Sequence, residues 1–332
     1  MKRLFLKTLV AAVALAAFGM AQAQTKTIKF ANQNAKGHPI LLGMDKFAEL
    51  VDAKSGGKLK VNVFAGGALG SDQANVSALQ GGTLEMASMN SGIFASLVKD
   101  FSIYDFPFLF GNPKEADAVV DGPFGTAMHK KLEEKGLIGL GYYELGFRQI
   151  ANSKRPLTKV EDIAGLKLRV IPNPINVDWV TALGANPTPL PFPEVYAALE
   201  QKAIDGQENP VATIKGAKLF EVQKYMTLTN HQYNPQSIVV SKKFWDTLAP
   251  ADQKILQDAA RESIQYQRTQ SRAALQSGLE DLKKGGMQIS ELSPAEVTKL
   301  RDKMKPVITK HSATAGEATV KAMMAELDKA RK

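Results

Sequence analysis

Apolar and polar residues follow two alternating patterns along most of the chain. Residues 27–31 form a short apolar run and residues 58–63 alternate between polar and apolar, which predicts two strands, the second with one buried face. Between them, apolar residues recur at helical spacing after Pro39, and proline is favoured at the first position of a helix. Strand and helix continue to alternate, which predicts an α/β fold with mainly parallel sheets.

The same patterns, with flanking Gly, Pro, Ser and Asn residues, predict the remaining elements. The predicted strands cover residues 84–88, 137–143, 167–170, 225–229, 237–240 and 287–290. The predicted helices are one that Ser71-Asp72 caps and that reaches Gln80, and two over residues 174–183 and 193–204. Others begin at Pro113, after Pro294 and near Thr314. A second α/β unit is expected to begin near Phe147.

One helical pattern is unusually long. It runs over residues 250–284, and no proline interrupts it after its first position. Helices of globular proteins typically have about 8–20 residues. The pattern contains no sustained heptad, so we expect a single helix that crosses between two lobes rather than a coiled coil.

The first 23 residues have the composition of an export signal. Basic residues within the first seven positions precede an apolar run over residues 9–19, and Ala-Gln-Ala follows at 21–23. The run is too short for a membrane-spanning helix, which needs roughly 20 residues. We therefore predict a cleavable signal peptide over residues 1–23 and a periplasmic mature protein. It is not expected to be membrane-embedded, because charges or prolines interrupt every later apolar stretch.

Composition narrows the classes of function. The formal net charge is +9, and the basic residues of the signal segment carry three of these charges. The remaining Lys and Arg residues alternate with Asp and Glu and do not cluster with aromatic residues, so no nucleic-acid partner is predicted. The chain contains no cysteine, which excludes disulfides, thiolate nucleophiles and cysteine-ligated zinc.

Local signatures of catalysis are missing from the sequence. It contains no HExxH zinc motif, Walker A loop or GxSxG nucleophile elbow, and Gly139-x-Gly141 lacks the third glycine of a dinucleotide fingerprint. The histidines are far apart, at His38, His129, His231 and His311. We predict no catalytic residues, no metal and no cofactor. Acid–base sites need no local motif, so a secreted enzyme acting on acidic sugars remains the alternative class.

Residues 142–209 contain an ordered series of short motifs. They read GFRQ at 146–149, NSKRP at 152–156, GLKLRV at 165–170, LGANP at 183–187, FPEVY at 192–196 and DGQENP at 205–210. Further motifs precede and follow them: GHP at 37–39, LGSD at 69–72, EVQKY at 221–225 and TNH at 229–231. In this order the set closely resembles the solute-binding proteins of tripartite ATP-independent periplasmic (TRAP) transporters, the DctP family.

The resemblance implies a fold and a partner. The fold is a two-lobe, periplasmic-binding-protein-like α/β structure with a hinge and a long lobe-spanning helix. The first lobe is expected to comprise residues 24–146 plus about 235–272, and the second residues 147–234 plus about 273–332. The protein would close on a small organic acid and deliver it to the membrane subunits of a TRAP permease, without using ATP.

The resemblance also implies a carboxylate site around Arg169. An arginine guanidinium offers a flat pair of donors that matches a carboxylate, which lysine cannot do. The family match assigns Arg169 the main ion pair with the ligand, Arg148 a second ligand-facing position and Asn209 a supporting amide. Phe192 is expected to pack on the ligand's carbon skeleton. Taken without the family, Arg169 also fits a surface residue of its strand, Arg148 a structural ion pair and Phe192 a core residue.

Polar residues of the first lobe are expected to contact the rest of the ligand. The family match points to Gln33, Asp72 and Asn90, with Asn173 and Tyr233 as further candidates. Asp72 has an alternative role, because an aspartate at this place can simply cap its helix. Prolines at 172 and 174 depart from many family members and would stiffen the wall of the pocket.

Two classes of ligand remain open. A polar first lobe suits a hydroxylated sugar acid such as a uronate or an aldonate, whereas a second basic anchor would suit a C4-dicarboxylate. The two arginines do not decide, because both can serve one carboxylate, and we favour the sugar acid. A ligand-sensing extracytoplasmic protein without a transport role is a further alternative.

Overall fold

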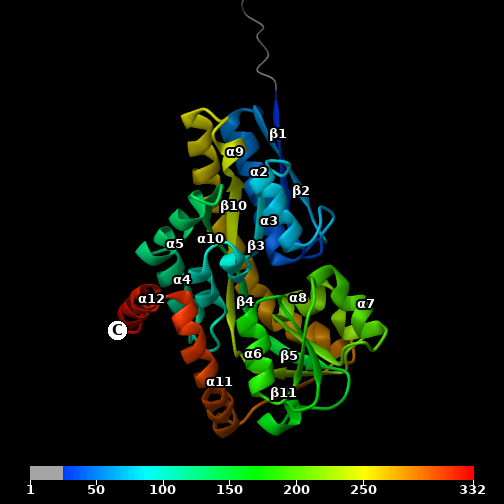
Figure 1. Cartoon of the computed structure of the whole chain (residues 1–332). Coiled ribbons are helices and arrows are strands. Elements are labelled where there is room, and N and C mark those ends of the chain that lie inside the picture. The colour runs from blue at the N-terminus through cyan, green and yellow to red at the C-terminus, as the bar shows by residue number, and fades with distance from the viewer. Residues whose placement is uncertain (1–24) are drawn as a thin grey trace, which may run out of the picture.

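The computed structural model describes residues 25–332, and the predicted signal peptide, residues 1–23, lies outside the described residues. Two α/β lobes, each built on one sheet, are stacked end to end (Figure 1). A cavity lined by residues of both lobes lies between them. Mixed α/β structure and two lobes agree with the predicted fold class.

The first lobe is built on a five-stranded sheet of order β2-β1-β3-β10-β4. Its strands are β1 (Lys26–Ala31), β2 (Leu59–Phe64), β3 (Met86–Asn90), β4 (Leu137–Phe147) and β10 (Tyr233–Ser241). β1 pairs in parallel with β2 and β3, whereas β10 lies antiparallel between β3 and β4.

The second lobe is built on a six-stranded sheet of order β11-β9-β5-β8-β6-β7. Its strands are β5 (Gln149–Asn152), β6 (Lys167–Val170), β7 (Asn186–Pro189), β8 (Gly206–Asn209), β9 (Tyr225–Leu228) and β11 (Gln288–Glu291). β6 lies parallel to β7 and β8, while β5 runs antiparallel to β8 and β9.

Both sheets are therefore mixed, and the expectation of mainly parallel sheets was wrong in this respect. The antiparallel pairs involve β10 and β5, which begin where the chain crosses from one lobe to the other. A strand that enters a sheet directly from the neighbouring lobe does not need the helical crossover that connects parallel strands.

Helices cover the faces of both sheets. In the first lobe these are α2 (Pro39–Ser55), α3 (Asp72–Gly81), α4 (Pro113–Val120), α5 (Pro123–Glu133) and α9 (Lys242–Trp245), with 3-10 helices η1 (Ser91–Ser96) and η2 (Lys99–Asp105) after β3. In the second lobe they are η3 (Val160–Ile163), α6 (Pro174–Ala182), η4 (Phe192–Glu194), α7 (Val195–Glu200), α8 (Val211–Gly216) and η5 (Leu219–Glu221). The N-cap at Ser71 is confirmed, because its Oγ accepts a bond of 3.3 Å from the backbone N–H of Ala74.

The long helix α10 (Pro250–Lys284) has the predicted bounds and spans both lobes. Its first half packs on α2 and β4, where Lys54 forms an ion pair of 2.8 Å with Glu262. Its last turns pack on α8 of the second lobe, where Lys215 forms an ion pair of 2.5 Å with Asp281. A single uninterrupted helix thus connects the two lobes (Figure 1).

The C-terminal helices do not all lie in the second lobe, to which the expected boundaries assigned residues up to 332. α11 (Pro294–Ala315) packs on both η2 and α6, and α12 (Glu317–Ala330) returns to α4 and α5 of the first lobe. Arg331, just after α12, forms an ion pair of 2.9 Å with Glu115 of α4. The turn at Gly316 reverses the chain after α11, and this reversal brings α12 back to the first lobe.

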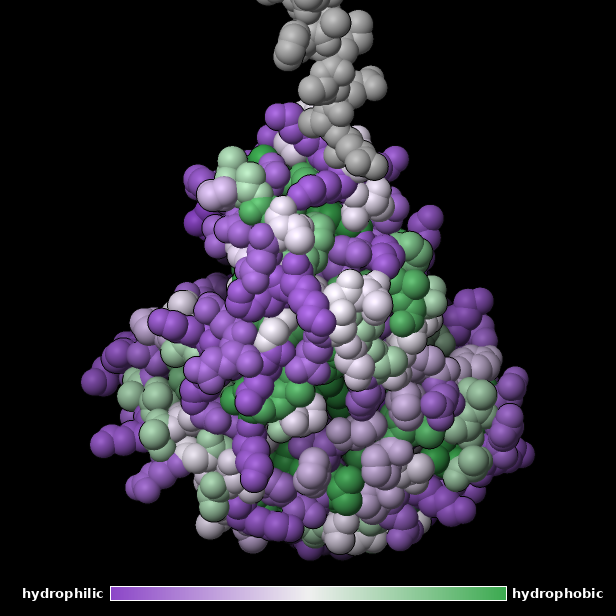
Figure 2. All heavy atoms as spheres, turned by 45° about the horizontal axis from the view of Figure 1, so that its top comes forward, coloured by the Kyte–Doolittle hydropathy of each residue, from purple (hydrophilic) through white to green (hydrophobic). Residues whose placement is uncertain are grey.

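Apolar residues form three clusters that support this arrangement. One lies between α2, α10 and the first sheet, and another lies under α7 and α8. The largest is continuous from the first lobe to α6, α11 and α12, with Trp179 fully buried in it. Within residues 25–332, every helix is too short or too polar to span a lipid bilayer. Figure 2 shows hydrophilic residues over most of one face, with hydrophobic residues in small patches among them.

Candidate functional site

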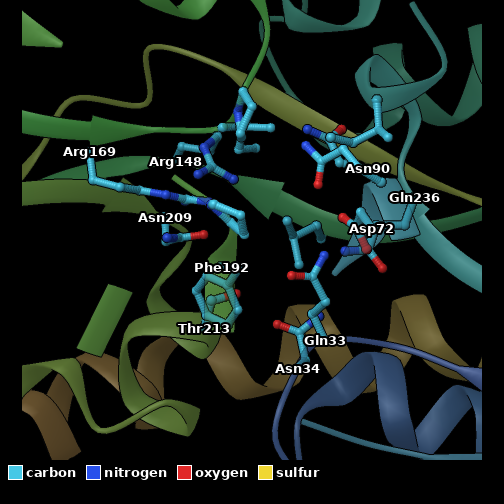
Figure 3. A pocket seen from close by; sticks show the side chains of 16 residues that line it. Gln33, Asn34, Asp72, Asn90, Arg148, Arg169, Phe192, Asn209, Thr213 and Gln236 are labelled. Carbon is cyan, nitrogen blue, oxygen red and sulfur yellow. The ribbon is translucent and has the colours of Figure 1, made fainter. Parts of the chain in front are cut away.

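A small cavity lies between the two lobes, and residues of both lobes line it. The side chains that line it point into it from both lobes (Figure 3). The first lobe contributes Gln33, Asn34, Asp72, Gln73, Asn90, Ile93, Leu145 and Gln236, and the second contributes Arg148, Arg169, Ile171, Pro172, Pro191, Phe192, Asn209 and Thr213. Seven of the nine residues predicted to bind ligand are among them.

Arg169 is buried at the wall of this cavity, and one of its N–H donor groups is unpaired. Strand β6 carries it, its Nε donates to the backbone oxygen of Leu190 at 2.8 Å, and its guanidinium lies 5.8 Å from the centre of the Phe192 ring. Nη1 has no hydrogen-bond partner among the described residues. Burial lowers the pKa of Arg169 to about 10, which still leaves it charged at neutral pH. The site therefore presents an incompletely paired cation to whatever enters it.

Arg148 lines the cavity but is already neutralised. Both Nε and Nη2 donate to the carboxylate of Glu208, and Nη1 donates to Asn234 Oδ1 at 2.9 Å. Arg148 is fully buried and Glu208 is 1% exposed. Burial raises the pKa of Glu208, but the charge of Arg148 outweighs this effect and holds the pKa at about 2. Arg148 therefore has the structural ion pair that its sequence also allowed, at the edge of the ligand cavity.

Asn209 and Phe192 line the same side of the cavity as Arg169. Asn209 ends β8, is 3% exposed, and its Nδ2 donates to Gln207 Oε1 at 2.6 Å. Phe192 opens η4, is half-buried, and presents its ring to the cavity (Figure 3). A cation, an amide and an aromatic face are thus gathered on the second-lobe side.

The first-lobe wall carries amides and one carboxylate. Gln33 and Asn90 both line the cavity, and Gln33 Oε1 has no hydrogen-bond partner among residues 25–332. Asp72 is the first residue of α3, and Ser71 caps that helix instead, so the alternative of Asp72 as the cap was wrong. Desolvation raises the pKa of Asp72 to about 6, against the opposing effects of Gln33 and the charge of Arg169.

The structure places the other two candidates outside the cavity lining. Asn173 turns away from the cavity and donates to Asp105 and to the backbone oxygen of Gly92. Tyr233 packs edge-on between the rings of Phe110 and Phe147, with ring centres 5.5 and 5.1 Å away. Both side chains are held by protein groups rather than presented to a ligand.

Sequence reasoning missed several lining residues, including Thr213, Asn34 and Gln236. Thr213 meets His38 of the opposite lobe. Nδ1 of His38 accepts from the N–H of Ile40, so Nε2 carries the proton and donates to Thr213 Oγ1 at 3.1 Å. Burial lowers the pKa of His38 to about 3, which keeps the ring neutral. The GHP motif at 37–39 could have pointed to His38 as a residue near the site, whereas no pattern near Thr213 indicates a contact between the lobes.

Asp72 gives the first testable prediction. Its pKa in the folded protein lies above the unfolded value of 3.8, so its favourable contribution to stability is complete below that value and is lost as the pH rises through about 6. We expect Asp72→Asn to raise the melting temperature of the ligand-free protein at pH 7.5 and to have little effect at pH 4. Calorimetric scans at both values measure this, and an equal shift at both would show that the Asp72 charge is not the cause.

Residues 25–332 contain no cluster of His, Asp and Glu that could hold a metal ion. Within those residues, the cavity combines a buried arginine with a spare donor, amides from both lobes and a half-buried aromatic ring. An arginine of this kind pairs with a carboxylate, and amides pair with hydroxyl or carbonyl groups. The fold and the site therefore define a two-lobe binding protein for a small anionic solute.

The family model of bacterial extracellular solute-binding proteins, family 7 (DctP), matches residues 30–314, and the chain belongs to this family. It is a solute-binding protein of the TRAP transporter type, as its motifs predicted. The family consists of extracytoplasmic solute receptors and not of enzymes.

Solved structures and curated relatives resemble the chain over most of its length. A TRAP periplasmic solute-binding protein from Ochrobactrum anthropi, with its C-terminus bound in the ligand-binding pocket, is 53% identical with a TM-score of 0.82, covering 93% of this chain and 97% of that one. The sugar acid binding protein DctPAm from Advenella mimigardefordensis, in complex with galactonate, is 40% identical with a TM-score of 0.91, covering 92% and 99%. The C4-dicarboxylate-binding periplasmic protein DctP of Rhodobacter capsulatus is 33% identical over 95% of each chain.

Proposed function

We propose that this protein captures a small hydroxylated monocarboxylate, a sugar acid such as an aldonate or a uronate, in the periplasm. The ligand carboxylate pairs with Arg169 between the lobes, and the loaded protein delivers it to a TRAP permease in the membrane. The observation that carries the proposal is that Nη1 of the buried Arg169, in the interlobe cavity, has no hydrogen-bond partner among the described residues.

The distribution of charge favours one carboxylate over two. Among the described residues that line the cavity, the cations are Arg148 and Arg169, both from the second-lobe side, and Glu208 already neutralises Arg148. The opposite wall has amides and the Asp72 carboxyl. The distal carboxylate of a C4-dicarboxylate would meet Asp72, whereas hydroxyl groups would find acceptors in Gln33 Oε1 and Asp72.

The most similar ligand-bound structure named above has a sugar acid, galactonate, at 40% identity, and the dicarboxylate-binding relative is more distant at 33%. A C4-dicarboxylate therefore remains the alternative ligand. Export is supported by the signal-like segment 1–23, and delivery to a permease by membership of the family.

The ligand class is tested by calorimetric titration with four acids: D-galactonate, D-galacturonate, D-erythronate and succinate. We expect at least one of the three hydroxylated monocarboxylates to bind with one-to-one stoichiometry and to be recovered chemically unchanged. Succinate is expected to bind at least tenfold more weakly. Tighter binding of succinate would contradict the sugar-acid proposal in favour of the alternative, and conversion of the bound acid would indicate an enzyme.

A further inference from the structure

Asp105 is a fully buried carboxylate that does not line the ligand cavity. It ends η2, in the segment of the first lobe that follows β3. Its two oxygens each receive two amide donors: Oδ1 from Asn234 at 3.1 Å and Asn90 at 3.4 Å, and Oδ2 from Asn173 at 2.7 Å and Asn176 at 3.2 Å. Four side-chain amides therefore converge on one carboxylate.

Second partners fix the orientation of two of these amides. Asn234 Oδ1 accepts from Nη1 of Arg148 at 2.9 Å, so its Nδ2 must face Asp105. Asn176 Oδ1 accepts from the indole N–H of Trp179 at 3.2 Å, which turns its Nδ2 to Asp105 in the same way. Because arginine and indole nitrogens are donors only, neither amide can be flipped.

Backbone groups fix the other two. Asn90 Oδ1 accepts from the N–H of Gly92 at 3.4 Å, and Asn173 Nδ2 also donates to the carbonyl of Gly92 at 3.2 Å. All four amides thus present N–H groups to Asp105. A carboxamide in its place would oppose one of its own N–H groups to these donors, so an ionised carboxylate is the side chain that satisfies the cluster.

The cluster joins the two lobes beside the ligand cavity. Asn90 belongs to the first lobe and lines the cavity, whereas Asn173 and Asn176 open α6 in the second lobe, directly after Ile171 and Pro172 of the cavity wall. A Cβ atom on Gly92 would lie 2.1 Å from Asp105 Oδ2, so glycine permits this close approach.

We propose that Asp105 is a positioning residue that slows ligand release. Its carboxylate binds the first turn of α6 to the first lobe, and this connection keeps the cavity wall at 171–172 closed over the ligand. Asp105 itself does not contact the ligand. The inference rests on the proposed function, because it assigns a role in retaining the ligand of that same site.

The kinetics of ligand release test this role. Stopped-flow fluorescence with D-galactonate can use Trp179, one of two tryptophans in the chain, as reporter. Asn173→Ala removes one donor from the second-lobe side, and loss of a hydrogen bond to a charged group predicts a dissociation rate about tenfold higher. Asp105→Asn is expected to have a larger effect. The association rate and one-to-one stoichiometry should be unchanged, and Asn186→Ala, an exposed asparagine of β7, serves as the matched control.

A merely structural role would lower the melting temperature or the active fraction without changing the release rate of the active molecules. If the dissociation rate of Asn173→Ala lies within twofold of that of the unmodified protein, the proposal is overturned, even if Asp105→Asn fails to fold.

The distance between the lobes can also be measured without a ligand. Because the chain has no native cysteine, spin labels can be attached at Lys60→Cys on the first lobe and Gln201→Cys on the second. Adding Asn173→Ala should shift their distance distribution to larger separations, and an unchanged distribution contradicts the inference. Failure of the unmodified protein to bind any acid contradicts the proposed function instead.

Discussion

Replacing Arg169 with alanine is expected to abolish ligand binding while the protein remains folded. Loss of one partner of a buried charge pair costs about 2–5 kcal/mol, which corresponds to an affinity lower by a factor of roughly 30 to several thousand. The fold should tolerate the change, because the Arg169 side chain donates one hydrogen bond to protein, to the backbone of Leu190, and burial already disfavours its charge. Calorimetric titration with the best ligand of the acid panel measures the loss.

Two variants make this result specific. Arg169→Lys keeps a charge but cannot offer a flat pair of donors, so we expect it to recover only part of the affinity. Arg261→Ala removes an arginine of α10 whose side chain is 72% exposed, and it should bind as the unmodified protein does. Affinity unchanged in Arg169→Ala would refute the assignment of the carboxylate site.

The second large effect concerns stability and comes from the Arg148–Glu208 pair. Glu208→Gln removes the negative partner and leaves the fully buried Arg148 without a counter-ion. Breaking a buried pair in this way typically destabilises a protein by about 3–5 kcal/mol. Urea unfolding at pH 7 should show this loss in the free energy of unfolding, together with unaltered ligand stoichiometry for the molecules that remain folded.

The same pair gives the effect a defined pH dependence. The pKa of Glu208 in the folded protein, about 2, lies below its value of 4.5 in the unfolded chain, so the stabilisation is complete above 4.5 and is lost as the pH falls toward 2. The difference in stability between the unmodified protein and Glu208→Gln should therefore shrink as the pH falls from 5 to 3. Asp246→Asn breaks an exposed pair with Lys242 and serves as control, with a small effect expected. A difference independent of pH would show that the Glu208 charge is not responsible.

Local patterns predicted the elements that position the site. The strand over 167–170 has the predicted bounds, and glycine and proline lie close to its two ends. The helix over 250–284 also has the predicted bounds, and it contains no proline after its first position. Arg169, Asn209 and Phe192, to which the ordered motifs pointed, line one cavity. The predicted helix over 193–204 instead became η4 and the short α7, which ends at Glu200.

The remaining features depend on contacts between distant residues, which no local pattern encodes. Arg148 finds its counter-ion 60 positions away in Glu208, and Asn173 finds Asp105 68 positions earlier. An arginine or an asparagine at the end of a strand looks the same in sequence whether it faces a ligand or a protein group. The antiparallel placement of β10 likewise depends on how the chain returns from the second lobe, which the alternation of elements does not specify.

A crystal structure of the protein with its best-binding acid would show directly which residue holds the ligand carboxylate. We predict a closed cleft in which the ligand carboxylate lies within hydrogen-bond distance of Arg169 Nη1, with ligand hydroxyl groups facing Gln33 and Asp72. A ligand carboxylate that lies against the first-lobe wall, with Arg169 Nη1 still unpaired, would show that Arg169 does not anchor the solute.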